Sequence, residues 1–222
     1  MNYILSLMPQ ILEGLKVTLE VFALTLILAI PLGIIVALAR TSKSLILKKI
    51  VGAYILVMRG TPLLLQIVII YFGLPLVTIH FGEPFVGMTF DRFTAAIVAF
   101  VLNYTAYFGE IFRAGIISID RGQYEGAEVL GLTQKDTFFR IILPQAIKRV
   151  IPPVANEITT LVKDTSLVYI LGLDELLKVA KIASNRDVTL IPLILAGVVY
   201  LIVIGVLSKV LEKIEKKYEY YK

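Results

Sequence analysis

Five stretches of this chain are long and apolar enough to cross a lipid bilayer, and this feature constrains the fold more than any other. A helix needs about 20 mostly apolar residues to span the hydrocarbon core. The stretches run roughly over residues 11–39, 50–79, 93–117, 150–171 and 190–211. Hydrophobic residues make up 58% of the chain and charged residues 18%, against about 45–50% and about 25% in soluble domains. We predict an all-α integral membrane protein with a single transmembrane domain over 1–222.

The basic residues gather on one side of this predicted topology. Lysine and arginine are frequent after the first stretch, after the third stretch and in the C-terminal tail. The alternate connections hold only Arg92, Lys178, Lys181 and Arg186. Because connections rich in lysine and arginine stay in the cytoplasm, we predict a multi-pass protein with its N-terminus outside and its C-terminus in the cytoplasm. This distribution explains the formal net charge of +5, so no nucleic-acid partner is indicated.

Several chemistries are excluded by residues that the chain lacks. It has no cysteine and one histidine, His80, so thiolate and histidine-rich metal sites are excluded, and we expect His80 only to pack at the membrane interface. The hydrolase patterns HExxH and GxSxG do not occur, and Ser166 near Lys163 has a spacing that recurs by chance. The phosphate-binding pattern GxxxxGK[ST] is also absent. We therefore predict a chain that is not an enzyme and that itself binds no metal, ATP or other cofactor.

The longest polar passage, at about 118–148, predicts two short helices joined at Gly131. Glycine ends a helix at low cost because it readily adopts the left-handed conformation. Thr133 followed by Asp136 resembles a capping box and predicts the start of the second helix, which we expect Pro144 to end. Such a pair would lie at the cytoplasmic membrane surface rather than cross the membrane.

The second apolar stretch is interrupted by the sequence MRGTPLLLQ. Pro62 has no N–H to donate to the carbonyl of Met58, four residues earlier, so we expect that carbonyl to be free beside Arg59 and Thr61. Irregular backbone at membrane depth is tolerated only against protein or a water-filled cavity. The interruption therefore predicts either a plain kink or part of a binding site.

Ionisable side chains in membrane spans usually pair with one another or mark a transport path. In the third stretch, Asn103 and Glu110 lie on one helical stripe, and Glu110 is expected either to pair with Arg113 or to bind a ligand. The fourth stretch, in which we expect Pro152 and Pro153 in the first helical turn, carries a second polar set. That set is Asn156, Glu157, Thr160 and Asp164. Two acids on one helical face favour a cationic ligand.

Six positions in the 118–148 connection match the motif of a known family. They are Glu125, Ala127, Gly131, Ile141, Leu143 and Pro144. The pattern resembles the E-A-A, G, I-x-L-P motif of ABC importer permeases, although Gly126 stands where that motif has its first alanine. The sequences RGTP, YTAYFGEIFRAGI and KDTSL in the spans are similar to the polar amino acid permeases of type I importer fold. Glu157 beside Asn156 is similar to the basic amino acid group among them.

The resemblance implies an ATP-driven importer in the plasma membrane of a prokaryote, with the 118–148 connection as its coupling helix. The implied partners are two ATPase subunits that bind ATP and magnesium, a second copy of this permease or a similar one, and an extracytoplasmic amino acid-binding protein. The predicted substrates are arginine, lysine or histidine. The alternatives are a permease for glutamine or glutamate and an ion-coupled secondary transporter, which has no use for a coupling loop.

A free amino acid brings a carboxylate and an ammonium group, so complementary groups should surround it. We predict that Arg59 or backbone amides contact the carboxylate. The Met58 carbonyl, Asn103 and Glu157 are expected to contact ammonium or guanidinium groups. The rest of the predicted substrate-binding set is Thr61, Glu110, Asn156, Thr160 and Asp164.

Overall fold

The computed structural model describes residues 2–73, 75–76 and 89–218, and within these ranges all regular structure is helical. His80 and the predicted end of the second stretch therefore lie outside the described residues. In chain order the helices are α1 (Asn2–Thr41), α2 (Leu45–Gly60), α3 (Leu63–Val68), η1 (Ile69–Gly73), α5 (Arg92–Ile117), α6 (Arg121–Val129), α7 (Gln134–Asp136), η2 (Thr137–Ile142), α8 (Leu143–Asp164), η3 (Thr165–Leu171), α9 (Leu176–Asp187) and α10 (Ile191–Tyr218). Of the η segments, η1 and η2 are π-helical and η3 is a 3₁₀ helix.

Apolar helices carry the membrane character of the described chain. The helices α1, α5 and α10 are each long and apolar enough to cross a bilayer. The helix α2 and the α3–η1 segment together also reach this length and apolarity, as a bent pair. The predicted fourth stretch is α8 followed by η3, and α8 packs against both α5 and α10. The all-α integral membrane fold predicted from the sequence is confirmed.

The main packing contact of the fold is the crossing of α1 and α5. A Cβ added at Gly33 would lie 2.8 Å from the Cβ of Phe108, and one added at Gly109 would clash with Val36. Small residues at helix crossings in membranes let the backbones approach closely, and the gain is van der Waals contact. These two glycines therefore set how deeply α1 and α5 interlock.

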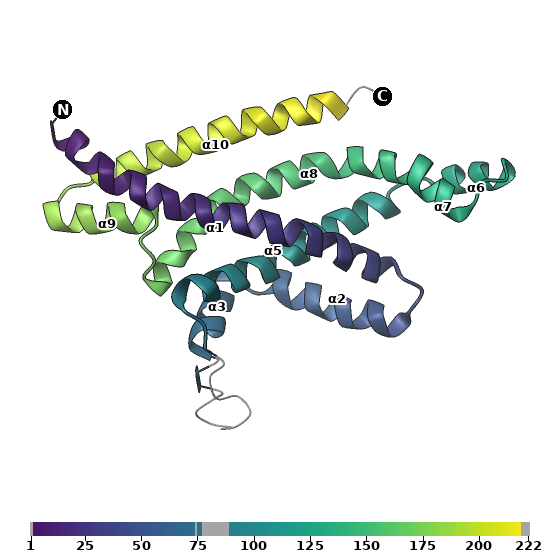
Figure 1. Ribbon diagram of the computed structural model, residues 1–222, viewed down its shortest axis with the longest axis horizontal. Helices are drawn as coiled ribbons and strands as arrows, with labels where there is room; N and C mark the ends of the chain where they lie inside the picture. Colours follow the sequence, from purple (N-terminus) through teal and green to yellow (C-terminus); the bar gives the residue numbers. More distant parts are fainter. Residues whose placement is uncertain (1, 74, 77–88, 219–222) are drawn as a thin grey trace.

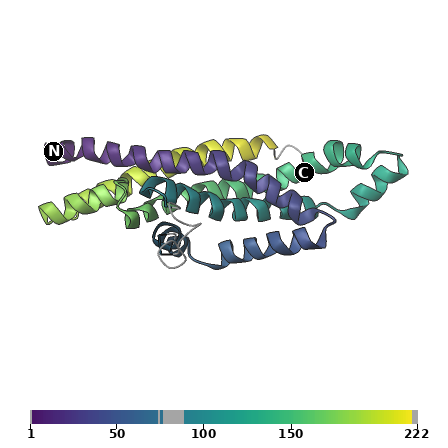
Figure 2. The ribbon, with the colours of Figure 1, turned by 60° about the horizontal axis from the view of Figure 1, so that its bottom comes forward.

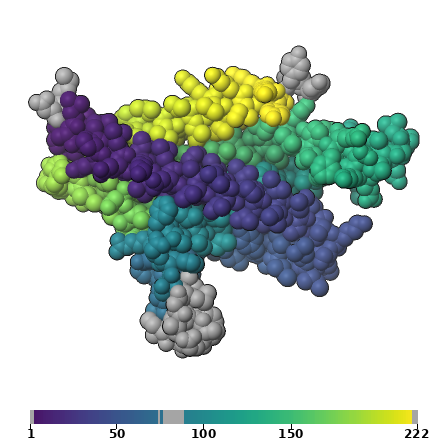
Figure 3. Space-filling view, viewed as in Figure 1, coloured from purple at the N-terminus to yellow at the C-terminus, as the bar shows by residue number. Residues whose placement is uncertain are grey.

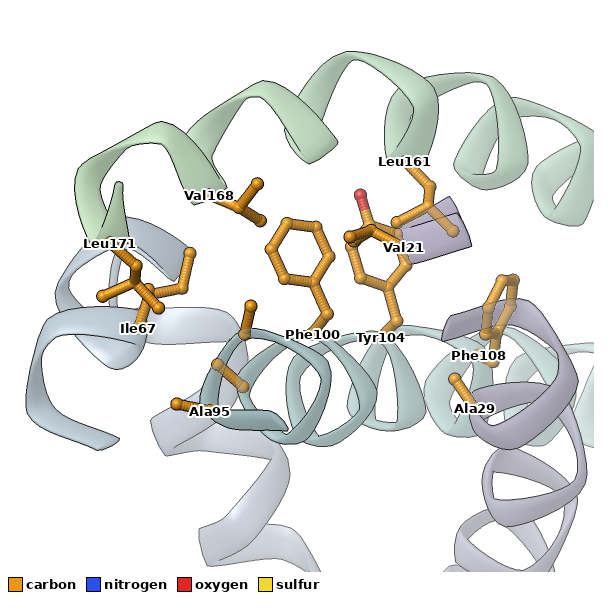
Figure 4. Close-up of a cluster of buried hydrophobic side chains, with 12 residues drawn as sticks. Val21, Ala29, Ile67, Ala95, Phe100, Tyr104, Phe108, Leu161, Val168 and Leu171 are labelled. Atoms are coloured by element: carbon orange, nitrogen blue, oxygen red, sulfur yellow. The ribbon is translucent and has the colours of Figure 1, made fainter. Parts of the chain in front are cut away.

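One face of α5 forms the centre of the largest buried cluster (Figure 4). Phe100, Tyr104 and Phe108 recur at intervals of four residues, and neighbouring ring centres lie 6.2 Å apart. Val21 of α1 and Leu161 of α8 pack against these rings. Because this aromatic face is buried between α1 and α8, the position of α5 is fixed against both of these helices.

A second cluster joins α9 to both terminal helices. Leu7 of α1, Leu176 of α9 and Ala196 of α10 are buried together. Glu175, which is fully buried, begins α9 by accepting hydrogen bonds from its first N–H groups, and it also accepts from the Tyr200 hydroxyl at 3.2 Å. This end of the molecule is therefore tied together by one carboxylate and an apolar core.

The two ends of the long axis carry different elements (Figures 1 and 2). The N-terminus and α9 lie at one end, whereas α6 and α7 project from the other. In the space-filling view, the α6–α7 region extends beyond the rest of the surface (Figure 3). The N-terminus and the 118–148 connection are thus far apart.

Proline positions in the fourth stretch differ from the prediction. Pro144 does not end a helix, because the π-helical turn η2 leads directly into α8, where Pro144 occupies the first turn. Pro144 lies where the π-helical turn changes to α-helix, and the fixed φ of proline suits the first turn of α8. Pro152 and Pro153, predicted for a first turn, lie inside α8 instead.

Candidate substrate-binding site

The second apolar stretch is broken, where the sequence predicted one span over 50–79. The helix axis bends by 106° between α2 and the α3–η1 segment. Thr61 between them is extended, with φ −121° and ψ 148°, because the ring of Pro62 disfavours the helical conformation in the residue before it. The chain therefore turns aside at Thr61 instead of continuing with a mild kink.

An open cavity of about 570 Å³ lies between this break, α5 and α8. The predicted substrate-binding residues that line it are Arg59, Thr61, Asn103, Glu157, Thr160 and Asp164. Met58, Glu110 and Asn156 do not line it. Tyr104 and Tyr107 do, and the sequence offered a signal for Tyr107, which lies one turn from Asn103 on the same stripe of α5.

Two carboxylates line the cavity and form no ion pair among the described residues. Among the ion pairs of the described residues, none includes Glu157 or Asp164. Asp164 instead accepts a hydrogen bond of 2.7 Å from the Tyr104 hydroxyl. Glu157 lies about two turns earlier on the same helix. Charged groups at membrane depth are costly without a partner, so a cation in the cavity would stabilise both carboxylates.

Arg59 is the basic residue of the cavity lining. Its guanidinium carbon lies 5.0 Å from the centre of the Tyr107 ring. This cation–π contact orients the guanidinium while leaving its N–H groups available. A guanidinium fits a carboxylate through two parallel hydrogen bonds, so Arg59 can receive the carboxylate of an amino acid.

The Met58 carbonyl, predicted to be free, is occupied. Pro62 does leave it without a helical donor, but the side-chain amide nitrogens of Gln66 and Asn103 each donate to it at 2.9 Å. A carbonyl has two lone pairs, so this one has no capacity left for a substrate. Gln66 was not among the predicted site residues, although a lone polar residue in the apolar run LLLQIV was a signal.

Glu110 is paired within α5. Arg113 donates through Nε to Oε2 of Glu110 at 2.8 Å and through Nη2 to the other carboxylate oxygen. Of the two roles considered for Glu110, the structure shows the ion pair. Asn156 is exposed and lies outside the cavity lining.

The cavity thus combines one guanidinium, two carboxylates and the side chains of Asn103 and Tyr107. This set is complementary to a zwitterion that carries an additional positive charge. Among the described residues, no group of three or more His, Asp or Glu side chains could hold a metal ion.

Local hydrogen bonds confirm the predicted helix break at Gly131 and the predicted helix start at Thr133, although the second helix continues through η2 into α8. Gly131 is left-handed with φ 73°, and its N–H and that of the next residue return to carbonyls of α6 at 2.9 and 3.0 Å, as in a Schellman motif. Thr133 begins the following helix, and its hydroxyl accepts from the N–H of Asp136 at 3.1 Å. Of the remaining motif residues, Ala127 is buried, Ile141 and Leu143 are half-buried, and Glu125 and Pro144 are exposed.

Side chains also hold this connection against α8. Gln145 donates to the Gln123 side chain at 3.1 Å, and Arg149 donates to the Ser118 carbonyl. These contacts tie the 118–148 connection to the first half of α8, whose second half lines the cavity.

The family model described as "Binding-protein-dependent transport system inner membrane component" matches residues 29–217. The chain is 38% identical to the arginine transport system permease protein ArtQ of Bacillus subtilis over 94% of this chain and 92% of that protein. It is 34% identical to the putative glutamine transport system permease protein GlnP of Rickettsia typhi, over 98% of each chain.

Solved structures agree with these relatives. The crystal structure of an amino acid ABC transporter with histidines contains a chain that superposes with a TM-score of 0.86 at 32% identity, over 97% of both chains. An inward-facing structure of the MetNI methionine ABC transporter superposes with a TM-score of 0.67 at 16% identity, which supports the fold alone.

Proposed function

This chain belongs to the family of binding-protein-dependent transport system inner membrane components, as an amino acid permease of ABC importers, and we propose that it imports basic amino acids. The cavity beside the α2–α3 break is the proposed substrate site. Arg59 would bind the α-carboxylate, and Glu157 and Asp164 would bind the cationic groups. The N-terminus would be extracytoplasmic, and the 118–148 connection and the C-terminus cytoplasmic.

The observation that carries this proposal is the charge of the cavity lining. Glu157 and Asp164 outnumber Arg59 by one carboxylate, and neither forms an ion pair among the described residues. A zwitterionic amino acid leaves this excess unbalanced, whereas arginine, lysine or protonated histidine neutralises it. The similarity to an arginine permease over 94% of the chain points in the same direction.

Transport by this chain would depend on partners. A pair of ATPase subunits would bind ATP and magnesium and receive the two short helices of the 118–148 connection. A second permease subunit, the same or similar, would complete the membrane unit, and an extracytoplasmic binding protein would deliver the amino acid. Because Gln145 and Arg149 link the connection to α8, closure of the ATPases would move the helix that carries Glu157 and Asp164.

The test is ATP hydrolysis by the permease–ATPase complex in liposomes. Binding protein loaded with arginine, lysine, histidine, glutamine or glutamate is added to separate samples. Stimulation by the basic amino acids alone supports the proposal. No stimulation by any of the five would overturn transport of these substrates.

Glutamine import is the second candidate, because putative glutamine permeases are 34% identical over nearly the whole chain. In the same assay, stimulation by glutamine that equals or exceeds stimulation by arginine would favour this candidate. The proposal that Glu157 and Asp164 select basic substrates would then be wrong.

A further inference from the structure

The α2–α3 break is closed by a small network of buried amides. Gln66 is 7% exposed and Asn103 is 4% exposed. Their side-chain nitrogens both donate to the Met58 carbonyl, and Asn103 Nδ2 also donates to Gln66 Oε1 at 3.0 Å. The second hydrogen of Gln66 Nε2 faces the Thr61 hydroxyl at 2.8 Å, and that hydroxyl donates to the Val57 carbonyl at 2.8 Å.

Elementary hydrogen-bond chemistry fixes the direction of every bond in this network. A backbone carbonyl can only accept, so both amides must turn their nitrogens toward Met58. The oxygen of Gln66 then faces Asn103. If the Asn103 amide were flipped, its Oδ1 would face two other oxygens, those of the Met58 carbonyl and the Gln66 side chain. The orientation of Asn103 is therefore set by Met58 and Gln66 and leaves no freedom for rotation.

The consequence appears at the other end of the Asn103 side chain. Both hydrogens of Nδ2 are used within the network, while Oδ1 receives no hydrogen bond from any described residue. This oxygen is not among the polar atoms that are sealed from solvent without a partner, and Asn103 lines the cavity. Asn103 can thus offer the cavity an acceptor and no donor.

The position of Asn103 indicates which part of a substrate it meets. Asn103 and Tyr107 lie one helical turn apart, with side chains about 5–6 Å from each other, and Tyr107 holds the guanidinium of Arg59. An amino acid whose carboxylate binds Arg59 has its α-ammonium on the adjoining carbon, within one turn of Asn103.

We propose that Gln66 is a positioning residue that holds Asn103 with its oxygen toward the cavity, so that Asn103 selects the α-ammonium of the substrate. This inference rests on the proposed function, because it requires an amino acid in the cavity. Gln66 itself lies behind the cavity lining and acts through Asn103. The requirement applies to any amino acid, whatever its side chain.

The test compares an amino acid with its α-hydroxy analogue, in which a hydroxyl replaces the ammonium. The measurement is competition for labelled L-arginine on the permease–ATPase complex in nanodiscs, without binding protein. The competitors are unlabelled L-arginine and its α-hydroxy analogue. If arginine does not bind, glutamine and its α-hydroxy analogue replace them. Gln66→Met should reduce the preference for the amine about tenfold, as expected for a lost hydrogen bond to a charged group. The affinity for the hydroxy analogue should change less than about twofold.

Further variants separate positioning from folding. Asn103→Ala should remove the same preference, and adding Gln66→Met to it should produce no further loss, because coupled residues are not additive. Gln66→Glu has the shape of glutamine but sets an oxygen against the Met58 carbonyl, so it should also reduce the preference for the amine. This variant replaces Gln66→Met in the test if Gln66→Met fails to assemble. Ser184→Ala in α9, which removes a buried side-chain donor to the Thr189 carbonyl after that helix, is the matched control and should leave the preference unchanged.

Each result bears on one of two claims. A wild-type preference retained in both Gln66 variants would overturn the positioning role while leaving the proposed function intact. Additive losses in the double variant would also overturn it, since Gln66 would then act independently of Asn103. A wild-type complex that binds neither amino acid would overturn the cavity as the substrate site, and the inference would fall with it, whereas the ATP hydrolysis test decides separately whether basic amino acids are imported.

Discussion

Glu110 and Glu157 are both carboxylates of membrane-spanning helices, yet their surroundings differ completely. Arg113 binds both carboxylate oxygens of Glu110 from one turn away on α5. Glu157 lies on α8 at the cavity with Asp164, and neither acid has an ion-pair partner among the described residues. A carboxylate neutralised within its own helix has no need of a ligand. Unneutralised carboxylates beside an open cavity can be neutralised by what enters it.

Removing the partner of Glu110 should produce the largest effect on stability. The Glu110 side chain is 23% exposed, and in Arg113→Ala it loses its ion-pair partner, so we expect the free energy of unfolding to fall by about 2–3 kcal/mol. Thermal unfolding of the detergent-solubilised protein measures this. Lys16→Ala, which breaks the exposed Lys16–Glu20 pair of 3.8 Å, should cost less than about 0.5 kcal/mol. Equal losses in the two variants would contradict the contrast drawn for Glu110.

The acid at the cavity should respond in binding rather than in stability. We expect Glu157→Gln to weaken arginine binding about tenfold, because a charged hydrogen-bond acceptor for the cation is lost. Binding of glutamine should change less than about threefold, and the unfolding temperature should not fall. Equilibrium binding of both labelled amino acids to the permease–ATPase complex tests this. Asn156→Ala, one residue away and outside the cavity, is the control. An unchanged arginine affinity in Glu157→Gln would mean that Glu157 has a structural role and does not bind the substrate.

The opposite charge in the cavity offers a complementary test. Tyr107→Leu removes the ring that orients Arg59, a contact worth about 0.5–1 kcal/mol. Because the α-carboxylate is common to all amino acids, arginine and glutamine should each bind about two- to fivefold more weakly. A loss confined to arginine would show that Tyr107 serves the acidic side of the cavity and not Arg59.

Glu175 is a third kind of carboxylate, outside the spans, and should show the smallest effect. Burial raises its pKa, although N–H groups of α9 oppose this shift. The folded protein therefore holds the proton to higher pH than the unfolded chain. The resulting contribution to stability is full below the unfolded pKa and declines as the pH rises through the raised folded pKa.

The difference in unfolding temperature between wild type and Glu175→Gln isolates this carboxylate from the other acids. As the pH rises from the acid range to neutrality, we expect the wild type to lose about 2 °C relative to the variant. The lost cap in the variant adds only a constant offset. Parallel curves would mean that Glu175 keeps the same pKa on unfolding.

The sequence predicted the 118–148 connection better than it predicted the cavity. A left-handed Gly131 and a Thr133 cap depend on residues within one or two helical turns, and both are confirmed. The cavity required knowledge of which side chains meet across helices. Six residues of the predicted set line it, because spacing alone places Glu157 and Asp164 on one face of α8, but spacing does not reveal the amides of Gln66 and Asn103 at the Met58 carbonyl.

The prolines illustrate what lies beyond local rules. Pro62 breaks its helix, whereas Pro152 and Pro153 remain inside α8. All of these residues lack an N–H, but the chain turns through 106° only beside Pro62 among them, where buried amides of Gln66 and Asn103 donate to the vacated carbonyl. The missing N–H by itself therefore does not decide whether a helix ends.

By itself, the sequence determined that this chain is helical, lies in a membrane and carries a capped polar connection. These properties follow from apolar length, charge distribution and short-range capping, which act between neighbours along the chain. The tertiary structure alone decided that Glu110 has an ion pair, that Glu157 and Asp164 have none among the described residues, and that the Met58 carbonyl is closed to substrate. Those outcomes depend on which donor reaches which acceptor within about 3 Å, and only the packing of α2, α3, α5 and α8 fixes such distances.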